Sequence, residues 1–171
     1  ELLLDALARR GFDDESIVAD LALCPPQRRR LRFAAIGRRN GAVLGFNARN
    51  SNQVIDLAEC PIADPRIAAL LPPLRLVLGE VLPPKMACDV EIVAAEDSLD
   101  LLLVSRVSMN GKRREQLIAF AGEHGVSRIS FQSDERFPPE VIIQFSAPLV
   151  RFGETAVAFP PGAFLQPSSA G

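Results

Sequence analysis

The chain has 171 residues, 48 % of them hydrophobic and 23 % charged, and its net charge is −2. This composition is typical of a globular domain and excludes wholesale disorder, which needs low hydrophobicity together with high net charge. No apolar run approaches the ~18 residues of a membrane-spanning helix. The first residues, from Glu1 to Asp5, lack the basic segment and the long apolar core of a signal peptide.

Three segments are predicted to be helices from their apolar spacing and end residues, at residues 1–10, 64–78 and 112–123. Asp64 is a suitable N-cap for the second helix and Pro65 a suitable first residue. Pro72 and Pro73 lie in its middle, where proline removes a backbone donor, so a break or two short helices are expected there. Gly79 is expected to end this helix.

Alternating apolar residues and turn signals predict a series of β-strands. They are expected at residues 29–37, 42–48, 53–57, 88–95, 99–106, 126–132, 140–145 and 156–159. The first two are separated by Asn40-Gly41, the strongest short hairpin signal. Because the strands come in hairpins rather than in βαβ units, the predicted class is α+β, with an antiparallel sheet packed against two to three helices.

Arginine is concentrated on the predicted strand 29–37 and its neighbours. The segment 21–55 has no acidic residue and carries a charge of +7. Alternation places Arg30 and Arg32 on the strand face opposite Leu31 and Phe33. Guanidinium groups bind phosphate with two hydrogen bonds and stack on bases, so the segment indicates a docking face for a polyanion such as RNA. The alternative is an exposed strand edge whose charges discourage aggregation.

The cysteine and histidine content argues against a disulfide framework and against a self-contained zinc site. Cys24, Cys60 and Cys88 are odd in number and widely spaced, and no CxxC pair occurs. This usage predicts a cytoplasmic protein. Cys24 and Cys88 are expected to be small core residues, and His124, the only histidine, is expected to complement a helix dipole. With no nucleotide fingerprint or GxSxG elbow either, the residues define no complete active site and no catalytic residue.

Four motifs occur in an order that is typical of one protein family. They are Arg28-Arg29-Arg30-Leu31-Arg32-Phe33, Gly45-Phe46, the segment from Val54 to Ile62 that contains Asp56 and Cys60-Pro61-Ile62, and Phe164-Leu165-Gln166. In this order they resemble the central domain of bacterial RNA uracil-5-methyltransferases, most closely the ribosomal branch that carries an iron–sulfur cluster. The resemblance covers nearly the whole chain, with Gln27 in place of an aromatic residue and Ser168 in place of an asparagine.

The resemblance implies a place for the chain within a larger enzyme. Residues 1–158 would be its central α+β domain, and residues 159–171 would begin the linker to a Rossmann-like domain that binds S-adenosylmethionine. A small RNA-binding barrel would precede the chain. The nucleophilic cysteine, the base and the cofactor loop for methylation of uridine C5 would all lie in the following domain, so the chain by itself is not expected to be an enzyme.

The resemblance also implies roles for particular residues. Arg28, Arg30 and Arg32 would contact RNA through phosphates and bases. Phe164 and Gln166 would line the pocket of a flipped uracil, the first by stacking and the second through its amide. Ribosomal RNA is the expected partner, and no contact with a membrane is expected.

Cys60 matches the last of four cysteines that hold a [4Fe–4S] cluster in many members of the family. The other three would lie upstream of Glu1, and a cluster needs four thiolates. The cluster is therefore expected only in the longer protein, and Cys60 is expected to be a free thiol in this chain.

Two other interpretations of the same residues stay open. The chain could be a complete, non-catalytic RNA-binding module, whose affinity for structured RNA would be lost when Arg30 and Arg32 become alanine. It could also be a plain structural or interaction domain with a solvated arginine edge, which would not bind RNA at modest salt.

Overall fold

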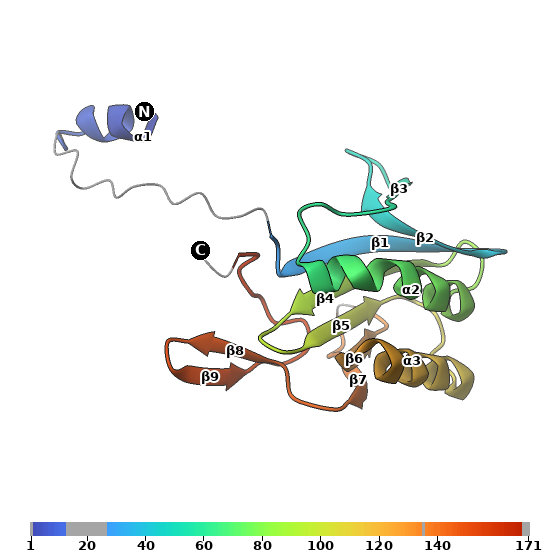
Figure 1. Cartoon of the computed structure of the whole chain (residues 1–171). Helices are drawn as coiled ribbons and strands as arrows, with labels where there is room; N and C mark the ends of the chain where they lie inside the picture. The colour runs from blue at the N-terminus through green and yellow to red at the C-terminus, as the bar shows by residue number, and fades with distance from the viewer. Residues whose placement is uncertain (1, 13–26, 135, 169–171) are drawn as a thin grey trace.

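The computed structural model describes residues 2–12, 27–134 and 136–168, so Cys24 lies outside the described residues. The described helices and strands are, in chain order, α1 (Leu2–Ala8), β1 (Arg30–Arg38), β2 (Gly41–Asn47), β3 (Val54–Asp56), α2 (Pro65–Val81), β4 (Ala87–Ala94), β5 (Leu99–Val104), α3 (Gly111–His124), β6 (Val126–Gln132), β7 (Glu140–Gln144), β8 (Leu149–Phe152) and β9 (Thr155–Ala158) (Figure 1). None of the helices in these residues is long and apolar enough to cross a membrane.

Seven strands form one sheet in the order β3-β2-β1-β4-β5-β6-β7. All neighbours are antiparallel except β5 and β6, which are parallel and are joined by α3. The α+β class is confirmed, but the expectation that strands come only in hairpins is wrong. A parallel pair needs a long crossover connection, and α3 supplies it between β5 and β6.

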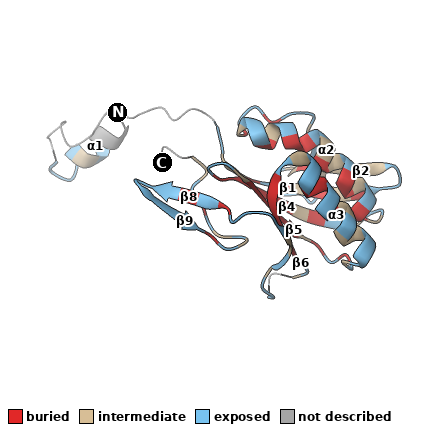
Figure 2. Cartoon of the chain, turned by 60° about the horizontal axis from the view of Figure 1, so that its bottom comes forward, coloured by how far each residue is buried: buried red, intermediate tan, exposed pale blue. Residues whose placement is uncertain are grey.

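Helices α2 and α3 cover one face of this sheet, and the main core lies between them and the strands (Figures 1 and 2). On β1 the predicted alternation is confirmed, because Leu31 and Phe33 are 5 % and 1 % exposed and face this core. The core also contains fully buried residues from the other elements, namely Leu44, Ile67, Leu74, Leu78, Val90, Ile92, Leu101, Leu103, Leu117 and Ile129. The opposite face of β1 and β4 therefore carries the polar side chains.

Helix α2 is continuous from Pro65 to Val81, so the predicted break at Pro72 and Pro73 is wrong. Two backbone donors are lost at the prolines, but the helix buries one apolar face against the sheet, and this burial offsets the loss. Gly79 does not end the helix either. A Cβ at Gly79 would come within 2.5 Å of the Cα of Gly41, so the glycine allows the β1–β2 turn to approach α2.

Asp64 caps α2 as predicted, with its Oδ1 atom accepting a hydrogen bond of 2.9 Å from the backbone nitrogen of Arg66. The Arg66 guanidinium also donates to both carboxylate oxygens of Asp64. Hydrogen bonding from the Arg66 side chain lowers the pKa of Asp64 below its usual value, although partial burial opposes the shift. The cap is therefore built for the ionised carboxylate.

We expect Asp64→Ala to lower the free energy of unfolding by about 1 kcal/mol at pH 7, because the helix loses its cap. Since the pKa is depressed in the folded state, this contribution is present above the unfolded pKa near 3.8 and is lost as the pH falls through the folded pKa. Urea unfolding at neutral and strongly acidic pH measures the difference. Asp64→Asn is the control: it keeps a side-chain oxygen for the cap but has no charge, so its stability relative to the unaltered chain should be lower at neutral pH and similar at strongly acidic pH. An equal loss for Asp64→Ala at both pH values would contradict the carboxylate's role.

The chain ends in a small second unit formed by the β8–β9 hairpin and the residues that follow it. Strand β8 was not predicted, and β9 ends at Ala158, one residue before the predicted end. Most of the hairpin is exposed (Figure 2). Val150, Phe159 and Leu165 nevertheless form a second apolar cluster with Val93 and Ala95, which belong to β4 and the residue after it. This cluster holds the end of the described chain against the sheet.

Candidate nucleic-acid interface

Two arginines of β1 lie on the sheet face opposite the helices, where they meet two acidic residues of β4. Arg30 donates to both carboxylate oxygens of Glu91, at 3.2 Å from Nε and 2.8 Å from Nη2. Arg32 donates to Asp89 at 2.6 Å. A two-point pair fixes the plane of a guanidinium as well as its position. Glu91 thus fixes the orientation of the Arg30 guanidinium, and the site combines two cations with two anions.

A cavity of about 310 Å³ lies beside these four side chains. Leu102 of β5 also lines it, and Pro161 and Gly162 of the C-terminal segment close one side. Gly162 has a φ of +73°, and a Cβ on it would lie 3.2 Å from a methyl group of Leu102. Because the segment at Gly162 lies so close to the sheet, the polar face of the strands forms one wall of a cavity instead of an open surface.

The C-terminal segment brings Phe164 and Gln166 next to the start of β1. The Arg30 guanidinium carbon lies 5.3 Å from the centre of the Phe164 ring, which is the geometry of a cation–π contact. Arg29 donates from Nε to the carbonyl oxygen of Gln166 at 3.0 Å, across 137 residues of sequence. Leu165, which lies between Phe164 and Gln166 in the sequence, is buried, whereas Phe164 is 70 % exposed. The structure therefore places Phe164 beside Arg30, one of the predicted arginines, and the backbone of Gln166 beside Arg29, which was not predicted to contact RNA.

A buried ion pair that was not predicted secures this arrangement. Arg128 of β6 donates twice to Asp100 of β5, at 2.8 Å each, and both side chains are at most 5 % exposed. Arg128 also donates to the carbonyl oxygen of Phe159 at 3.0 Å and lies over its ring. One guanidinium thus joins two strands to the C-terminal segment. The signal in the sequence was Asp100 within the otherwise apolar strand β5, and an arginine, Arg128, in the buried strand β6.

Arg28 lies at the entrance to β1 and is exposed. Its backbone pairs with the loop before α2: its nitrogen donates to Ile62 at 2.6 Å, and its carbonyl accepts from Asp64 at 3.0 Å. Cys60 belongs to the same loop, but it is only 6 % exposed and packs in the main core. The backbone of Arg28 therefore contacts the loop that contains Cys60. Neither residue lines the cavity at Arg30.

Asp56, the acidic residue of the third motif, has a structural role. It accepts a hydrogen bond of 3.2 Å from the backbone nitrogen of Leu44 and forms an ion pair with Arg75 of α2. The same Arg75 donates to the carbonyl oxygen of Leu57. These contacts fix the edge strand β3 to β2 and α2, just before the Cys60 loop.

The described residues do not fit an iron–sulfur cluster by themselves. Cys60 and Cys88 are the free cysteines of the described segments, and no group of three or more His, Cys, Asp or Glu side chains within those segments could hold a metal ion. A [4Fe–4S] cluster held by cysteine needs four thiolates. His124 lies against Phe120, with ring centres 4.9 Å apart, at the end of α3.

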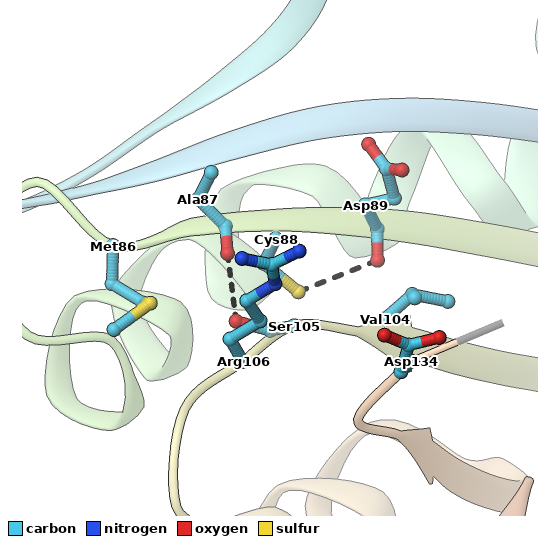
Figure 3. A pocket seen from close by; sticks show the side chains of 8 residues that line it. All are labelled: Met86, Ala87, Cys88, Asp89, Val104, Ser105, Arg106 and Asp134. Atoms are coloured by element: carbon cyan, nitrogen blue, oxygen red, sulfur yellow. Dashed lines mark hydrogen bonds between the residues drawn. The ribbon is translucent and has the colours of Figure 1, made fainter. Parts of the chain in front are cut away.

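A second cavity, of about 440 Å³, shares Asp89 and Val104 with the first (Figure 3). Cys88 lines it, but burial, together with the charge of Asp89, raises the pKa of this thiol to about 12. A thiol with this pKa is protonated at neutral pH and is a poor nucleophile. Cys88 is 2 % exposed, so its predicted place in the core is confirmed.

No family model matches the chain. The chain is, however, similar over nearly its whole length to proteins named as RNA methyltransferases. It is 36 % identical over 167 residues to an uncharacterized RNA methyltransferase of Brucella suis, which is 97 % of this chain and 38 % of that protein. It is 33 % identical over 164 residues to another of Mesorhizobium japonicum, covering 95 % of this chain and 38 % of the relative.

One relative carries a more specific name. The chain is 30 % identical over 141 residues to the 23S rRNA (uracil(1939)-C(5))-methyltransferase RlmD of Aeromonas salmonicida, which covers 81 % of this chain and 32 % of that enzyme. The chain thus spans less than two fifths of the length of these relatives. Their names support the family resemblance of the sequence motifs, and the chain corresponds to one segment of such proteins.

Proposed function

We propose that the chain is the RNA-facing segment of an RNA uracil-5-methyltransferase and that its arginine-lined sheet face contacts the substrate RNA. The observation that carries the proposal is the meeting of Arg30, Arg32 and Phe164 at one place, from opposite ends of the chain. A guanidinium next to an exposed aromatic ring is suited to single-stranded RNA, which offers a phosphate and an unstacked base at each nucleotide.

The paired carboxylates support this role rather than oppose it. Glu91 occupies two of the five N–H donors of Arg30, so the other three stay available to a phosphate or a base edge. Phe164 is 70 % exposed, which leaves room for a base to stack on the ring. Gln166 is exposed beside it, and its amide would both donate to and accept from a uracil edge. Arg28 would extend the contact along the RNA backbone.

The reaction belongs to the proposed whole enzyme. Bound S-adenosylmethionine would supply the methyl group, in a following Rossmann-like domain, and a preceding barrel would add RNA contacts. Cys60 is the thiol that we propose as a cluster ligand in the whole protein, with its other thiolates coming from elsewhere, and we assign no step to the cluster. Ribosomal RNA is the proposed substrate, and the cytoplasm the proposed location.

RNA binding by the 171-residue chain tests the proposal, with fluorescence anisotropy on a labelled uridine-containing stem–loop. We expect Arg30→Ala with Arg32→Ala to lower the affinity about tenfold or more and to reduce the salt slope by about 1.4, since each single-stranded phosphate contact contributes about 0.7. We expect Phe164→Ala to cost about 1–3 kcal/mol, the usual value of one stacked base.

Arg114→Ala is the matched control, because Arg114 lies on α3, pairs with Glu140 and does not line the cavity. Its RNA affinity should equal that of the unaltered chain. If the double arginine variant binds RNA as well as the control does, the arginine face is not the RNA contact. If the unaltered chain does not bind RNA at low salt, the structural-domain interpretation replaces the proposal.

A further inference from the structure

A groove of about 370 Å³ runs between α2 and α3. Val77 and Phe120, which are 8 % and 5 % exposed, give it an apolar base, together with Ala119. Leu76 stands at its edge with 71 % of its surface exposed, the highest value among the large apolar residues of the described segments. A singly exposed leucine is normal on a protein surface, but here it borders the apolar base, so the groove has a continuous apolar lining.

The ionisable residues that line the groove are Glu80 of α2 and Glu123 and His124 of α3. Gln116 also lines it and donates from its amide nitrogen to Glu80 at 2.9 Å. The amide oxygen of Gln116 is buried and has no hydrogen-bond partner among the described residues. Because this oxygen is buried, the exposed carboxylates of the groove, Glu80 and Glu123, are the acceptors that a partner can reach.

We propose that this groove binds a cationic amphipathic helix of a partner protein. The apolar side of such a helix would cover Leu76, Val77 and Phe120. A lysine or arginine beside it would lie near Glu80 and Glu123. Binding of a helix by its apolar face in a hydrophobic groove is a common recognition mode, and the carboxylates at the rim select positive charge.

The surface is suited to a protein and not to RNA. The two carboxylates of the groove have no lysine or arginine beside them among its lining residues, so they repel phosphate. The arginine face proposed for RNA, where each carboxylate is paired with an arginine, lies on the other side of the sheet from α2 and α3 (Figure 1). RNA and the partner helix would therefore bind at the same time. This inference does not depend on the RNA proposal, because it rests on residues of the helical layer alone.

The test uses a synthetic peptide and the 171-residue chain labelled with ¹⁵N. Isolated helices shorter than ~12–15 residues are marginal, so the peptide has about 18 residues, with leucine at positions i, i+4 and i+7 and arginine on both flanks. We expect NMR shifts to concentrate on α2 and α3. Glu80→Lys with Glu123→Lys should weaken binding about tenfold or more, because two attractions become repulsions. Leu76→Ser should weaken it to a similar degree.

Phe152→Ser is the control, because Phe152 is similarly exposed, at 65 %, but lies on β8. It should leave the peptide affinity unchanged, and a peptide with glutamate in place of arginine should not bind. Equal binding of both peptides, an unchanged affinity in the charge-reversed variant, or shifts centred outside α2 and α3 would overturn the proposal. So would a dimer of the chain that Leu76→Ser converts to a monomer, since a second copy would then occupy the groove.

Discussion

Arg128→Met is expected to lower the free energy of unfolding by about 3–5 kcal/mol, because it leaves the carboxylate of Asp100 buried without its partner. Asp100 is 3 % exposed, so water cannot replace the guanidinium. The variant also removes the donor to the carbonyl oxygen of Phe159. Urea unfolding followed by circular dichroism measures the loss.

A double variant separates the charge effect from the loss of the link to the C-terminal segment. When Arg128→Met is combined with Asp100→Leu, no charge is left buried, and most of the stability should return. The Phe159 carbonyl still lacks its donor, so a loss of about 1–3 kcal/mol should persist. If the single and double variants are equally destabilised, an unpaired buried charge is not the cause.

The ion pair of Arg128 and Asp100 should also affect RNA binding, although neither residue is proposed to contact RNA. Phe159 begins the segment that carries Phe164 to the arginine face, so release of its carbonyl should increase the mobility of that segment. The folded double variant is expected to bind the stem–loop more weakly while keeping its salt slope, since no phosphate contact is removed. An unchanged affinity would show that Arg128 does not position Phe164.

Gly45→Ala is the second change for which we expect a large effect. Gly45 of β2 is paired with Asp56 of β3, and a Cβ on it would collide with the backbone carbonyl oxygen of Ile55. The strands cannot separate without losing the hydrogen bond between Leu44 and Asp56. We expect the free energy of unfolding to fall by about 1–3 kcal/mol or more, as for an overpacked core site.

Gly111→Ala is the matched control, because nothing lies within 4 Å of the added Cβ and the residue begins α3. It should leave stability unchanged or raise it by about 0.5–1 kcal/mol, since alanine has less conformational freedom to lose. In Gly45→Ala, displacement of β3 should also expose Cys60, so alkylation of Cys60 should become faster when followed by peptide mass spectrometry. If the variant keeps both its stability and the slow alkylation of Cys60, the close approach of β3 is not required.

Local patterns predicted much of this fold. Alternation along β1 correctly separates Arg30 and Arg32 from Leu31 and Phe33, because side chains of a strand point to opposite faces by geometry alone. Asn40-Gly41 correctly marks the β1–β2 turn. Asp64 correctly starts α2, because a helix cap depends on residues within one turn.

The errors in the predicted fold arise from packing between distant segments. Pro72 and Pro73 do not break α2, because the free energy gained by burying seven apolar side chains exceeds the cost of losing two backbone hydrogen-bond donors. The parallel pair of β5 and β6 depends on how α3 packs on the sheet, and the hydrophobic pattern of each strand is the same for either direction. Strand β8 depends on its pairing with β9 and was missed because only four residues take part.

For the candidate site, too, the residue types could be predicted from the sequence, but their arrangement could not. Its residue types are present in the sequence order: arginines on β1, a buried cysteine before α2, and Phe164 with Gln166 near the end. Their assembly depends on contacts that span most of the chain, such as those of Arg30 with Glu91 and Phe164. The Arg128–Asp100 pair that holds the C-terminal segment is equally non-local. Sequence alone therefore determined which groups are available, while tertiary structure decided which of them meet, because ion pairs and ring contacts act only over a few ångströms.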